Sequence, residues 1–391
     1  MVSCAQKVKT SNFNIKKEET ISKHPIKTGA QQTQLYLHLL KGKNVAVVAN
    51  QTSIIAKETN GKYEYTHLVD SLLSLTILIK KVFAPEHGFR GEADAGELVK
   101  NGVDTKTGLP LISLYGKNKK PSAEQLKKID IVVFDIQDVG ARFYTYISTL
   151  HYVMEACAEN KIPLVILDRP NPNGHYIDGP VLEKEHKSFV GMHQVPVVYG
   201  MTIGEYGQMI NGENWLNNGV KCDVKIIPLQ NYEHQTAYSL PVKPSPNLPN
   251  DVSINLYPSL CFFEGTTISA GRGTEMQFQI YGSPFLNKNN FSFTPQPNAG
   301  AKHPKYNNET CFGEDLRAYK TLSLLNLSWL QKAYTENTSN GFFNSFFTNL
   351  AGTKKLQQQI EQGLTETEIR KTWQKGLLNF KVVRSKYLLY E

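Results

Sequence analysis

The chain has 391 residues, of which 40% are hydrophobic and 20% are charged. This composition is ordinary for a globular protein, and the length allows two or three domains. The formal net charge of +8 is uneven, because residues 1–30 hold six lysines and two glutamates while the rest of the chain holds 37 basic and 33 acidic residues. The body has no dense stripe of Lys and Arg interleaved with aromatics, so we expect no nucleic-acid partner, whereas a small anionic substrate is compatible with the charge.

From about residue 35 onward, short β-branched runs alternate with amphipathic stretches, which predicts an α/β fold with a Rossmann-like parallel sheet. The expected strands are residues 44–49, 75–83, 109–114, 131–134, 163–167 and 222–227. The expected helices are residues 65–74, 122–128, 144–160 and 202–216. Capping boxes, Ser122 with Gln125 and Thr202 with Glu205, mark the starts of two of these helices.

Five prolines within residues 241–258 precede segments that are rich in Phe, Thr, Gly and Asn, so we place a domain boundary near residue 245. Beyond it, Thr365 and Glu368 open a helix to about residue 378, and residues 380–390 are expected to form a closing strand. The expected organisation is a flexible tail (1–30), a Rossmann-like domain (31–245) and a smaller α+β domain (246–391).

The five cysteines are too widely spaced for a zinc knuckle, a redox pair or a dense disulfide framework, so we expect those of the body to be buried. Cys4 differs, because its segment (VSCAQ) resembles the end of a bacterial lipoprotein signal, although no apolar region precedes it here. One hypothesis is a lipid anchor at Cys4 with a flexible tether, in the periplasm or on a membrane of a Gram-negative envelope. The other is a disordered N-terminus without an anchor. No apolar run in the chain is long enough to span a bilayer.

Polar side chains follow four of the predicted strands, where ligands bind in open α/β sheets. These groups are residues 50–52 (NQT), 85–91 (PEHGFRG), 135–142 (DIQDVGAR) and 168–174 (DRPNPNG). Their convergence predicts a polar pocket at this edge, although Asn, Asp, Gly and Pro also serve as caps and turns in such loops. The first group, Asn50, Gln51 and Thr52, suits either helix capping or a ligand equally well.

Glu86 and His87 form the strongest of these groups, because a carboxyl beside an imidazole suits general acid or base catalysis. The alternative is a loop ion pair between Glu86 and Arg90. Most of the acidic loop that follows is expected to be solvated, although Glu97 could reach the pocket.

Asp135 and Asp138 have two interpretations. They could pair with Arg142 on a first helical turn. They could equally belong to a substrate site, because Tyr144 and Tyr146 follow and aromatic faces beside polar groups suit sugar rings.

Two further arginines could bind a carboxylate. Arg169 lies near Asn171 in a proline-rich turn that suits a two-point grip, the alternative being a salt bridge to a neighbouring aspartate. Arg272 and Glu264 lie in a glycine-rich segment that forms either a pocket wall or a hairpin with an exposed ion pair.

Several common enzyme signatures are absent from the sequence. There is no P-loop, no Gly-x-Gly-x-x-Gly after the first strand, no Gly-x-Ser-x-Gly elbow and no His-Glu-x-x-His. A metal centre would need scattered groups such as His87, Asp135 and Asp138, so we expect neither a metal nor a cofactor.

Taken together, these motifs resemble the exo-β-N-acetylmuramidase (NamZ-type) family across roughly residues 35–390. Besides the four groups above, they include ADAGE (93–97), YTY (144–146) and EGTTISAGRGT (264–274). The resemblance implies a Rossmann-like domain that holds most of the active site and a smaller C-terminal domain that closes it. It also implies removal of terminal β-linked N-acetylmuramic acid from the non-reducing ends of peptidoglycan fragments.

This activity needs two carboxyl groups and a cation for the lactyl carboxylate of the sugar. We predict Glu86 as the acid, assisted by His87, and Asp135 as the second carboxyl, with Glu97 and Glu264 behind it. The candidate cations are Arg90, Arg142, Arg169 and Arg272. Muramyl saccharides are the expected partners, and the sequence predicts no particular oligomeric state. A cell-wall binding protein without turnover and a metal-dependent hydrolase stay open as alternatives.

Overall fold

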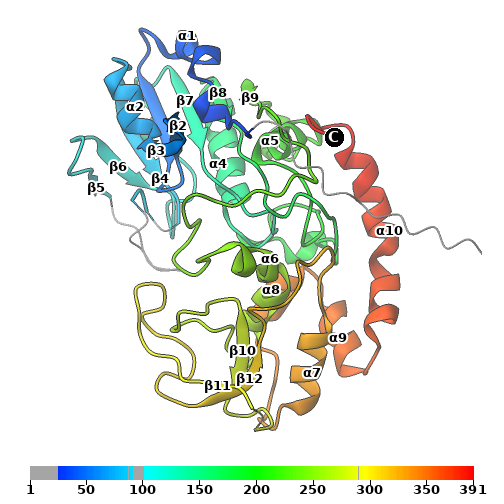
Figure 1. Ribbon diagram of the computed structural model, residues 1–391. Helices are drawn as coiled ribbons and strands as arrows, with labels where there is room; N and C mark the ends of the chain where they lie inside the picture. The colour runs from blue at the N-terminus through cyan, green and yellow to red at the C-terminus, as the bar shows by residue number, and fades with distance from the viewer. Residues whose placement is uncertain (1–24, 87, 91–100, 289) are drawn as a thin grey trace, which may run out of the picture.

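A seven-stranded sheet occupies the centre of the N-terminal half of the protein (Figure 1). The computed structural model describes residues 25–86, 88–90, 101–288 and 290–391. The strand order is β5-β6-β4-β1-β7-β8-β9, and β5 pairs antiparallel to its neighbour while the other pairs are parallel. The strands are β1 (Val45–Ala49), β4 (Ile79–Ala84), β5 (Gly102–Val103), β6 (Pro110–Ser113), β7 (Ile131–Asp135), β8 (Leu164–Leu167) and β9 (Val224–Ile227). The expected α/β class is confirmed.

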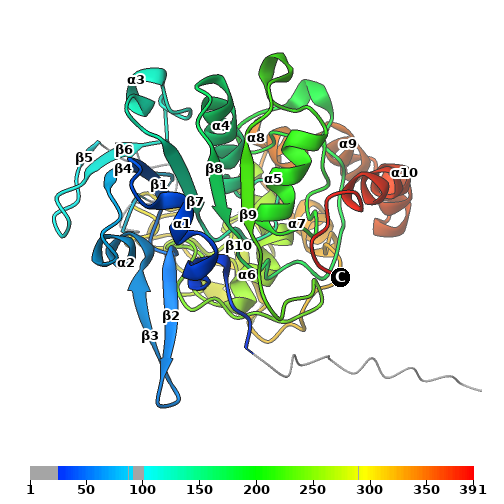
Figure 2. The same cartoon turned by 90° about the horizontal axis from the view of Figure 1, so that it is seen from above.

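Helices cover both faces of this sheet, which explains why its central strands are almost entirely apolar. Alternate residues of β7 enter two separate cores: Phe134 packs with α4 and α5, and Val133 packs with α2. Figure 2 shows α4 and α5 on one side of the sheet and α1 and α2 on the other. The helices of this half are α1 (Leu37–Leu40), α2 (Leu68–Ser74), α3 (Ala123–Leu126), α4 (Tyr146–Glu159) and α5 (Ile203–Gly212). The capping boxes expected at α3 and α5 are both present.

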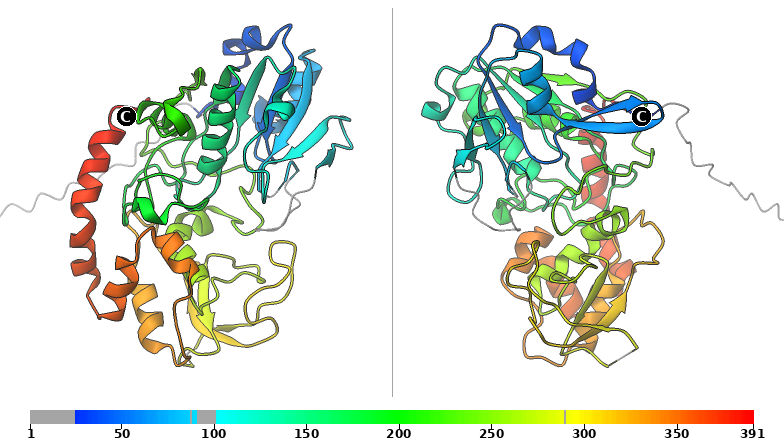
Figure 3. Two further views of the ribbon diagram at one scale, coloured as in Figure 1. Left: turned by 180° about the vertical axis from the view of Figure 1, so that it is seen from behind. Right: turned by 60° about the vertical axis from the view of Figure 1, so that its left-hand side comes forward.

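The C-terminal half contains a small antiparallel sheet of order β10-β12-β11 with helices beside it. Its strands are β10 (Ile280–Ser283), β11 (Ser292–Phe293) and β12 (Cys311–Asp315). Its helices are α6 (Asp251–Leu260), the 3-10 helix η5 (Cys261–Gly265), α7 (Ser328–Glu336), α8 (Phe346–Ala351), α9 (Lys355–Glu361) and α10 (Glu366–Arg384). Figure 3 shows α10 running along one side of the molecule and returning the chain to the large sheet. There Tyr390 donates a hydrogen bond to Asp168 Oδ2, and the Leu389 amide donates to Glu205.

The expected closing strand at residues 380–390 is wrong, because α10 continues to Arg384. Its buried side chains, Ile369, Trp373, Leu377 and Phe380, keep a spacing of three or four residues, which places them on one helical face against the core.

The helix expected at residues 65–74 begins three residues later, because a hairpin precedes it. This hairpin pairs β2 (Ile54–Thr59) with β3 (Lys62–His67). Asn60 and Gly61 connect the strands with positive φ angles of 53° and 74°, as a two-residue hairpin turn requires. The sequence analysis did not identify this Asn-Gly signal.

The last residues of the expected N-terminal tail lie against the body. The Lys27 amide donates to the Gln230 carbonyl oxygen, and Thr28 and Ala30 are buried. Cys4 and the rest of residues 1–24 are outside the described residues, so the lipid anchor stays a prediction. The four other cysteines are buried, as expected. In the described parts of the chain, no helix has the length and apolar character needed to cross a bilayer.

Candidate active site

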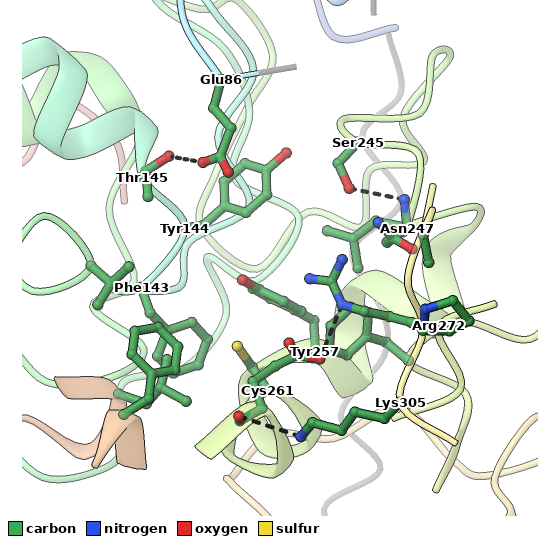
Figure 4. Close-up of a pocket in the computed structure, with 18 of the residues that line it drawn as sticks. Glu86, Phe143, Tyr144, Thr145, Ser245, Asn247, Tyr257, Cys261, Arg272 and Lys305 are labelled. Carbon is green, nitrogen blue, oxygen red and sulfur yellow. Dashed lines mark hydrogen bonds and ion pairs between the residues drawn. The ribbon is translucent and has the colours of Figure 1, made fainter. Parts of the chain in front are cut away.

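A cavity of about 480 Å³ is lined by residues from both halves of the chain (Figure 4). The N-terminal half contributes Glu86, Tyr115, Phe143, Tyr144, Thr145, Phe189 and Val190. The C-terminal side contributes Ser245, Asn247, Tyr257, Cys261, Glu264, Arg272, Phe278 and Lys305, among others. A cavity of this size can enclose a small ligand such as a saccharide unit. Of the residues predicted from sequence, Glu86, Tyr144, Glu264 and Arg272 line it.

Glu86 lies just after β4 and faces the start of α4. The Thr145 hydroxyl donates a hydrogen bond to Glu86 Oε2 over 2.7 Å, and the Tyr146 hydroxyl lies 3.4 Å from the Glu86 carbonyl oxygen. Tyr115 also lines the cavity, and burial, followed by the negative charge of Glu86, raises the pKa of its phenol. The start of α4 therefore holds Glu86 through the hydroxyl groups of Thr145 and Tyr146.

Arg272 and Glu264 form an ion pair at another part of the cavity wall, with 3.0 Å between Arg272 Nε and Glu264 Oε1. The two side chains keep 25% and 24% exposure. Both can therefore contact a ligand. In Figure 4 the side chains of Glu86 and Arg272 approach the cavity from different walls.

Aromatic rings form much of the remaining wall. Tyr257 packs edge-on against Tyr144, with 5.9 Å between ring centroids, and against Phe278, with 4.9 Å. The Tyr144 hydroxyl donates to the Pro244 carbonyl oxygen over 2.8 Å. Such rings beside charged groups suit the apolar and polar faces of a pyranose.

The Lys305 ammonium group fixes the segment that carries Glu264. It donates to the carbonyl oxygens of Phe263, Thr266 and Ile268 at 2.9 to 3.1 Å. Burial lowers the pKa of Lys305. Nothing in the sequence pointed to Lys305, because these contacts join positions about 40 residues apart.

Asp135 and Arg169 are paired with each other away from the cavity. Arg169 donates from Nε to Asp135 Oδ1 over 2.6 Å and from Nη2 to Asp135 Oδ2 over 2.9 Å. Asp135 is fully buried and Arg169 is 3% exposed. This arrangement does not support Asp135 as the second catalytic carboxyl or Arg169 as the group that binds a substrate carboxylate, because each neutralises the charge of the other and neither lines the cavity.

Asp138 and Arg142 also lie outside the cavity lining, and they are not paired. Asp138 accepts hydrogen bonds from the Tyr199 hydroxyl and the Gly140 amide, and burial raises its pKa to about 7. Arg142 is fully buried, and burial lowers its pKa to about 9. Its guanidinium donates to the carbonyl oxygens of Pro180, Val195, Leu350 and Ala351. These contacts lie inside the protein and neither residue lines the cavity, so the structure does not support the expected roles of Asp138 and Arg142 in substrate binding.

Residues 50–52 contact residues that lie next to the cavity lining. Asn50 Nδ2 donates to the Tyr146 hydroxyl over 2.9 Å, and Asn50 Oδ1 accepts from Thr52 over 2.6 Å. Gln51 Nε2 donates to the carbonyl oxygens of Lys243 and Pro244. These contacts hold the residues beside the cavity and do not place 50–52 in its lining.

The remaining predicted residues are placed as follows. Arg90 pairs with Asp104, with 2.8 Å between Nη2 and Oδ2, and so does not pair with Glu86. Asn171 is buried and donates to the Met201 carbonyl oxygen. His87 and Glu97 lie outside the described residues.

Several lining residues were missed by the sequence analysis. Thr145 had a signal, because it stands between two tyrosines that were selected. Tyr115 and Tyr257 had none, since isolated aromatic residues are usually core residues. Over the described ranges, one group of side chains could hold a metal ion, Glu183 with Glu185 and His186, and it does not line the cavity.

Two cavity carboxylates, an arginine and aromatic walls, carried by an α/β scaffold, are features of a glycoside hydrolase. The chain belongs to the exo-β-N-acetylmuramidase NamZ family. The family's N-terminal model matches residues 45–252, and its C-terminal model matches residues 255–390. The chain is 37% identical to the peptidoglycan β-N-acetylmuramidase NamZ of Bacillus subtilis (strain 168), an alignment that covers 96% of this chain and 94% of the relative.

Two crystal structures of DUF1343 family proteins from Bacteroides fragilis are also similar. One has 44% sequence identity and a TM-score of 0.84, and covers 94% of this chain and 99% of the other. The second has 27% identity and a TM-score of 0.78, with the same coverage. The predicted family, fold class and enzyme class are confirmed.

Proposed function

We propose that the protein removes terminal β-linked N-acetylmuramic acid from the non-reducing ends of peptidoglycan fragments and that this reaction takes place in the cavity. Glu86 and Glu264 are the two catalytic carboxyl groups. One observation carries this assignment: among the described residues that line the cavity, Glu86 and Glu264 are the carboxylic acids, and they come from different halves of the chain. Hydrolysis of a glycosidic bond uses one carboxyl group to protonate the leaving oxygen and another to activate water or to attack the sugar.

Arg272 is the proposed partner of the lactyl carboxylate. The other candidate arginines are occupied elsewhere: Arg90 by Asp104, Arg169 by Asp135, and Arg142 by backbone carbonyl oxygens. Arg272 lines the cavity, and its pairing with Glu264 uses Nε, which leaves terminal nitrogens for a ligand.

A lipid anchor at Cys4 and a periplasmic location remain part of the proposal. They rest on the sequence around Cys4 alone.

The substrate assignment is tested by comparing p-nitrophenyl glycosides of N-acetylmuramic acid and N-acetylglucosamine. The proposal expects turnover of the muramic glycoside, weak or no turnover of the other, and no loss of activity in a chelator. Arg272→Gln should raise KM for the muramic glycoside and reduce the preference between the two sugars. Arg317→Gln, which alters an exposed ion pair with Asp315, is the matched control and should change neither.

Binding of muramic ligands by folded protein without turnover would overturn the proposal in favour of a cell-wall binding protein. Loss of activity in the chelator, restored by a divalent metal, would instead favour a metal-dependent hydrolase.

A further inference from the structure

The side chain of Asn247 offers a hydrogen-bond acceptor without a donor in the wall of the cavity. Asn247 lines the cavity and is 1% exposed (Figure 4). Among the described residues, its Oδ1 atom has no hydrogen-bond partner. Buried polar atoms of folded proteins almost always have a partner, so an acceptor left open in a cavity wall indicates a donor that the ligand supplies.

The other half of the same amide fixes the orientation of this oxygen. Asn247 Nδ2 donates a hydrogen bond to the Gly300 carbonyl oxygen over 2.6 Å. Turning the amide by 180° would place Oδ1 against that carbonyl oxygen, and two acceptors cannot bond each other. The backbone amide of Asn247 donates to the Ser245 hydroxyl over 3.1 Å. These contacts hold the residue in one orientation and leave Oδ1 as a free acceptor.

The loop at residues 296–301 joins Asn247 to the segment that carries Arg272. Near its end, this loop accepts the hydrogen bond of the Asn247 side chain. At its start, the Gln296 amide donates to the carbonyl oxygen of Gly273, the residue after Arg272, over 2.8 Å. Figure 4 shows Asn247 and Arg272 on the same side of the cavity. A ligand group bound to Arg272 therefore has Asn247 as a neighbour.

Apolar side chains adjoin Asn247 in the cavity wall. Leu248 follows it in the chain, and Ala301 follows the residue that its side chain bonds; both are buried and line the cavity. Phe278 lines the cavity as well, and the Arg272 guanidinium lies 5.3 Å from the centroid of its ring. An acetamido group has one N–H donor and one methyl group, so it matches a single acceptor among apolar side chains. In N-acetylmuramic acid this group is on C2, next to the C3 atom that carries the lactyl ether.

We propose that Asn247 determines the specificity for the acetamido group of the substrate, because its Oδ1 atom accepts a hydrogen bond from the acetamido N–H while Arg272 binds the neighbouring lactyl carboxylate. This inference rests on the proposed function, but it does not depend on the role of either catalytic carboxyl group. The other donors on this sugar are its hydroxyl groups, so the test must separate the N–H from them.

The test removes the N–H and leaves the rest of the sugar unchanged. The p-nitrophenyl glycoside of N-acetylmuramic acid is compared with its 2-O-acetyl analogue, in which an ester oxygen replaces the N–H and cannot donate. Asn247→Ala should lower kcat/KM for the amide glycoside by roughly three- to tenfold, which is the contribution of one neutral hydrogen bond. It should lower kcat/KM for the ester glycoside much less, because the wild type makes no such bond to the ester. Any difference in the chemistry of the two glycosides cancels when the variant is divided by the wild type for each substrate.

Asn211→Ala is the matched control, because both atoms of the Asn211 amide bond the backbone of Cys222 and Asn211 does not line the cavity. It should change kcat/KM for neither glycoside. An equal loss on both glycosides in Asn247→Ala would overturn the acetamido role and leave the muramidase function standing.

If Asn247→Ala does not fold, calorimetry on the wild type decides. N-acetylmuramic acid should bind more tightly than its 2-O-acetyl counterpart, by roughly three- to tenfold. Equal affinities would overturn the inference. Absence of turnover of both glycosides by the folded wild type would instead overturn the proposed function itself.

Discussion

Arg169 and Asp135 join the carboxyl ends of two neighbouring strands through a two-point ion pair. Asp135 is the last residue of β7 and Arg169 follows β8, and the Nε–Oδ1 and Nη2–Oδ2 distances are 2.6 and 2.9 Å. The pair lies in the row of polar groups that the sequence assigned to a ligand. Because the pair is buried, these two charges neutralise each other inside the protein. Other members of the row, including Glu86, line the cavity.

Breaking this pair should destabilise the protein. Asp135→Asn leaves the Arg169 charge buried without its counter-ion, which typically lowers the free energy of unfolding by about 3–5 kcal/mol. Urea denaturation followed by circular dichroism measures the change. Glu124→Gln, at an exposed pair with Lys127, is the control and should have little effect. A loss for Asp135→Asn no larger than that of the control would contradict the structural role of the pair.

Gly352 is a second test of internal packing, at the point where the C-terminal half meets Arg142. Its φ angle is +70°, and a Cβ atom there would lie 2.7 Å from Arg142 Nη2. Gly363 has a similar φ of +74° with no atom within 4 Å of the added Cβ, so it reports the backbone cost alone. Gly363→Ala should cost about 1–2 kcal/mol of unfolding free energy. Gly352→Ala should cost about 1–3 kcal/mol more, from crowding. Equal losses in thermal or urea unfolding would show that Arg142 and Leu182, whose Cδ1 atom is also 2.7 Å from the added Cβ, move aside freely.

The buried Asp138 predicts a pH dependence of stability. Its pKa is about 7 in the folded protein because burial disfavours the charged form, against 3.8 as the usual value. Between these values the folded state keeps a proton that the unfolded state releases, so the unfolding free energy contributed by Asp138 falls as pH rises, by about 1.4 kcal/mol per unit. Asp138→Asn removes this titration. Over the roughly three pH units from pH 4 to 7, the unfolding free energy of the variant minus that of the wild type should therefore rise by several kcal/mol. A difference that is constant with pH would mean that Asp138 is ionised in the fold.

The α/β scaffold could be predicted because its buried strands are short apolar runs between helical patterns, as β1 and β7 illustrate. The end of α10 could not, because residues 380–390 (FKVVRSKYLLY) alternate locally like a strand, whereas the chain stays helical to Arg384 and Phe380 packs on the core. Secondary-structure propensity and the hydrophobic pattern over ten residues contain no information about such tertiary contacts.

The site was predicted in part for a similar reason. Glu86 and Arg272 line the cavity, whereas Asp135 and Arg169, which look equally suitable in sequence, satisfy each other. A sequence shows that polar groups gather at one edge of a sheet but not which of them pair across it. Lys305 illustrates the opposite error, since its role is created only when the chain folds back onto the segment that carries Glu264.

The central claim is that Glu86 takes part in the chemistry, and the most direct test is the effect of Glu86→Gln on hydrolysis of a p-nitrophenyl N-acetylmuramic acid glycoside. Glutamine keeps the size of the side chain and a hydrogen-bond acceptor for Thr145, but it can neither accept nor donate the catalytic proton. We predict that kcat falls by about a hundredfold or more while the unfolding transition stays close to that of the wild type. Glu183→Gln, at a surface pair with Lys355, should keep wild-type activity. Turnover by folded Glu86→Gln within a few-fold of the wild type would contradict the account.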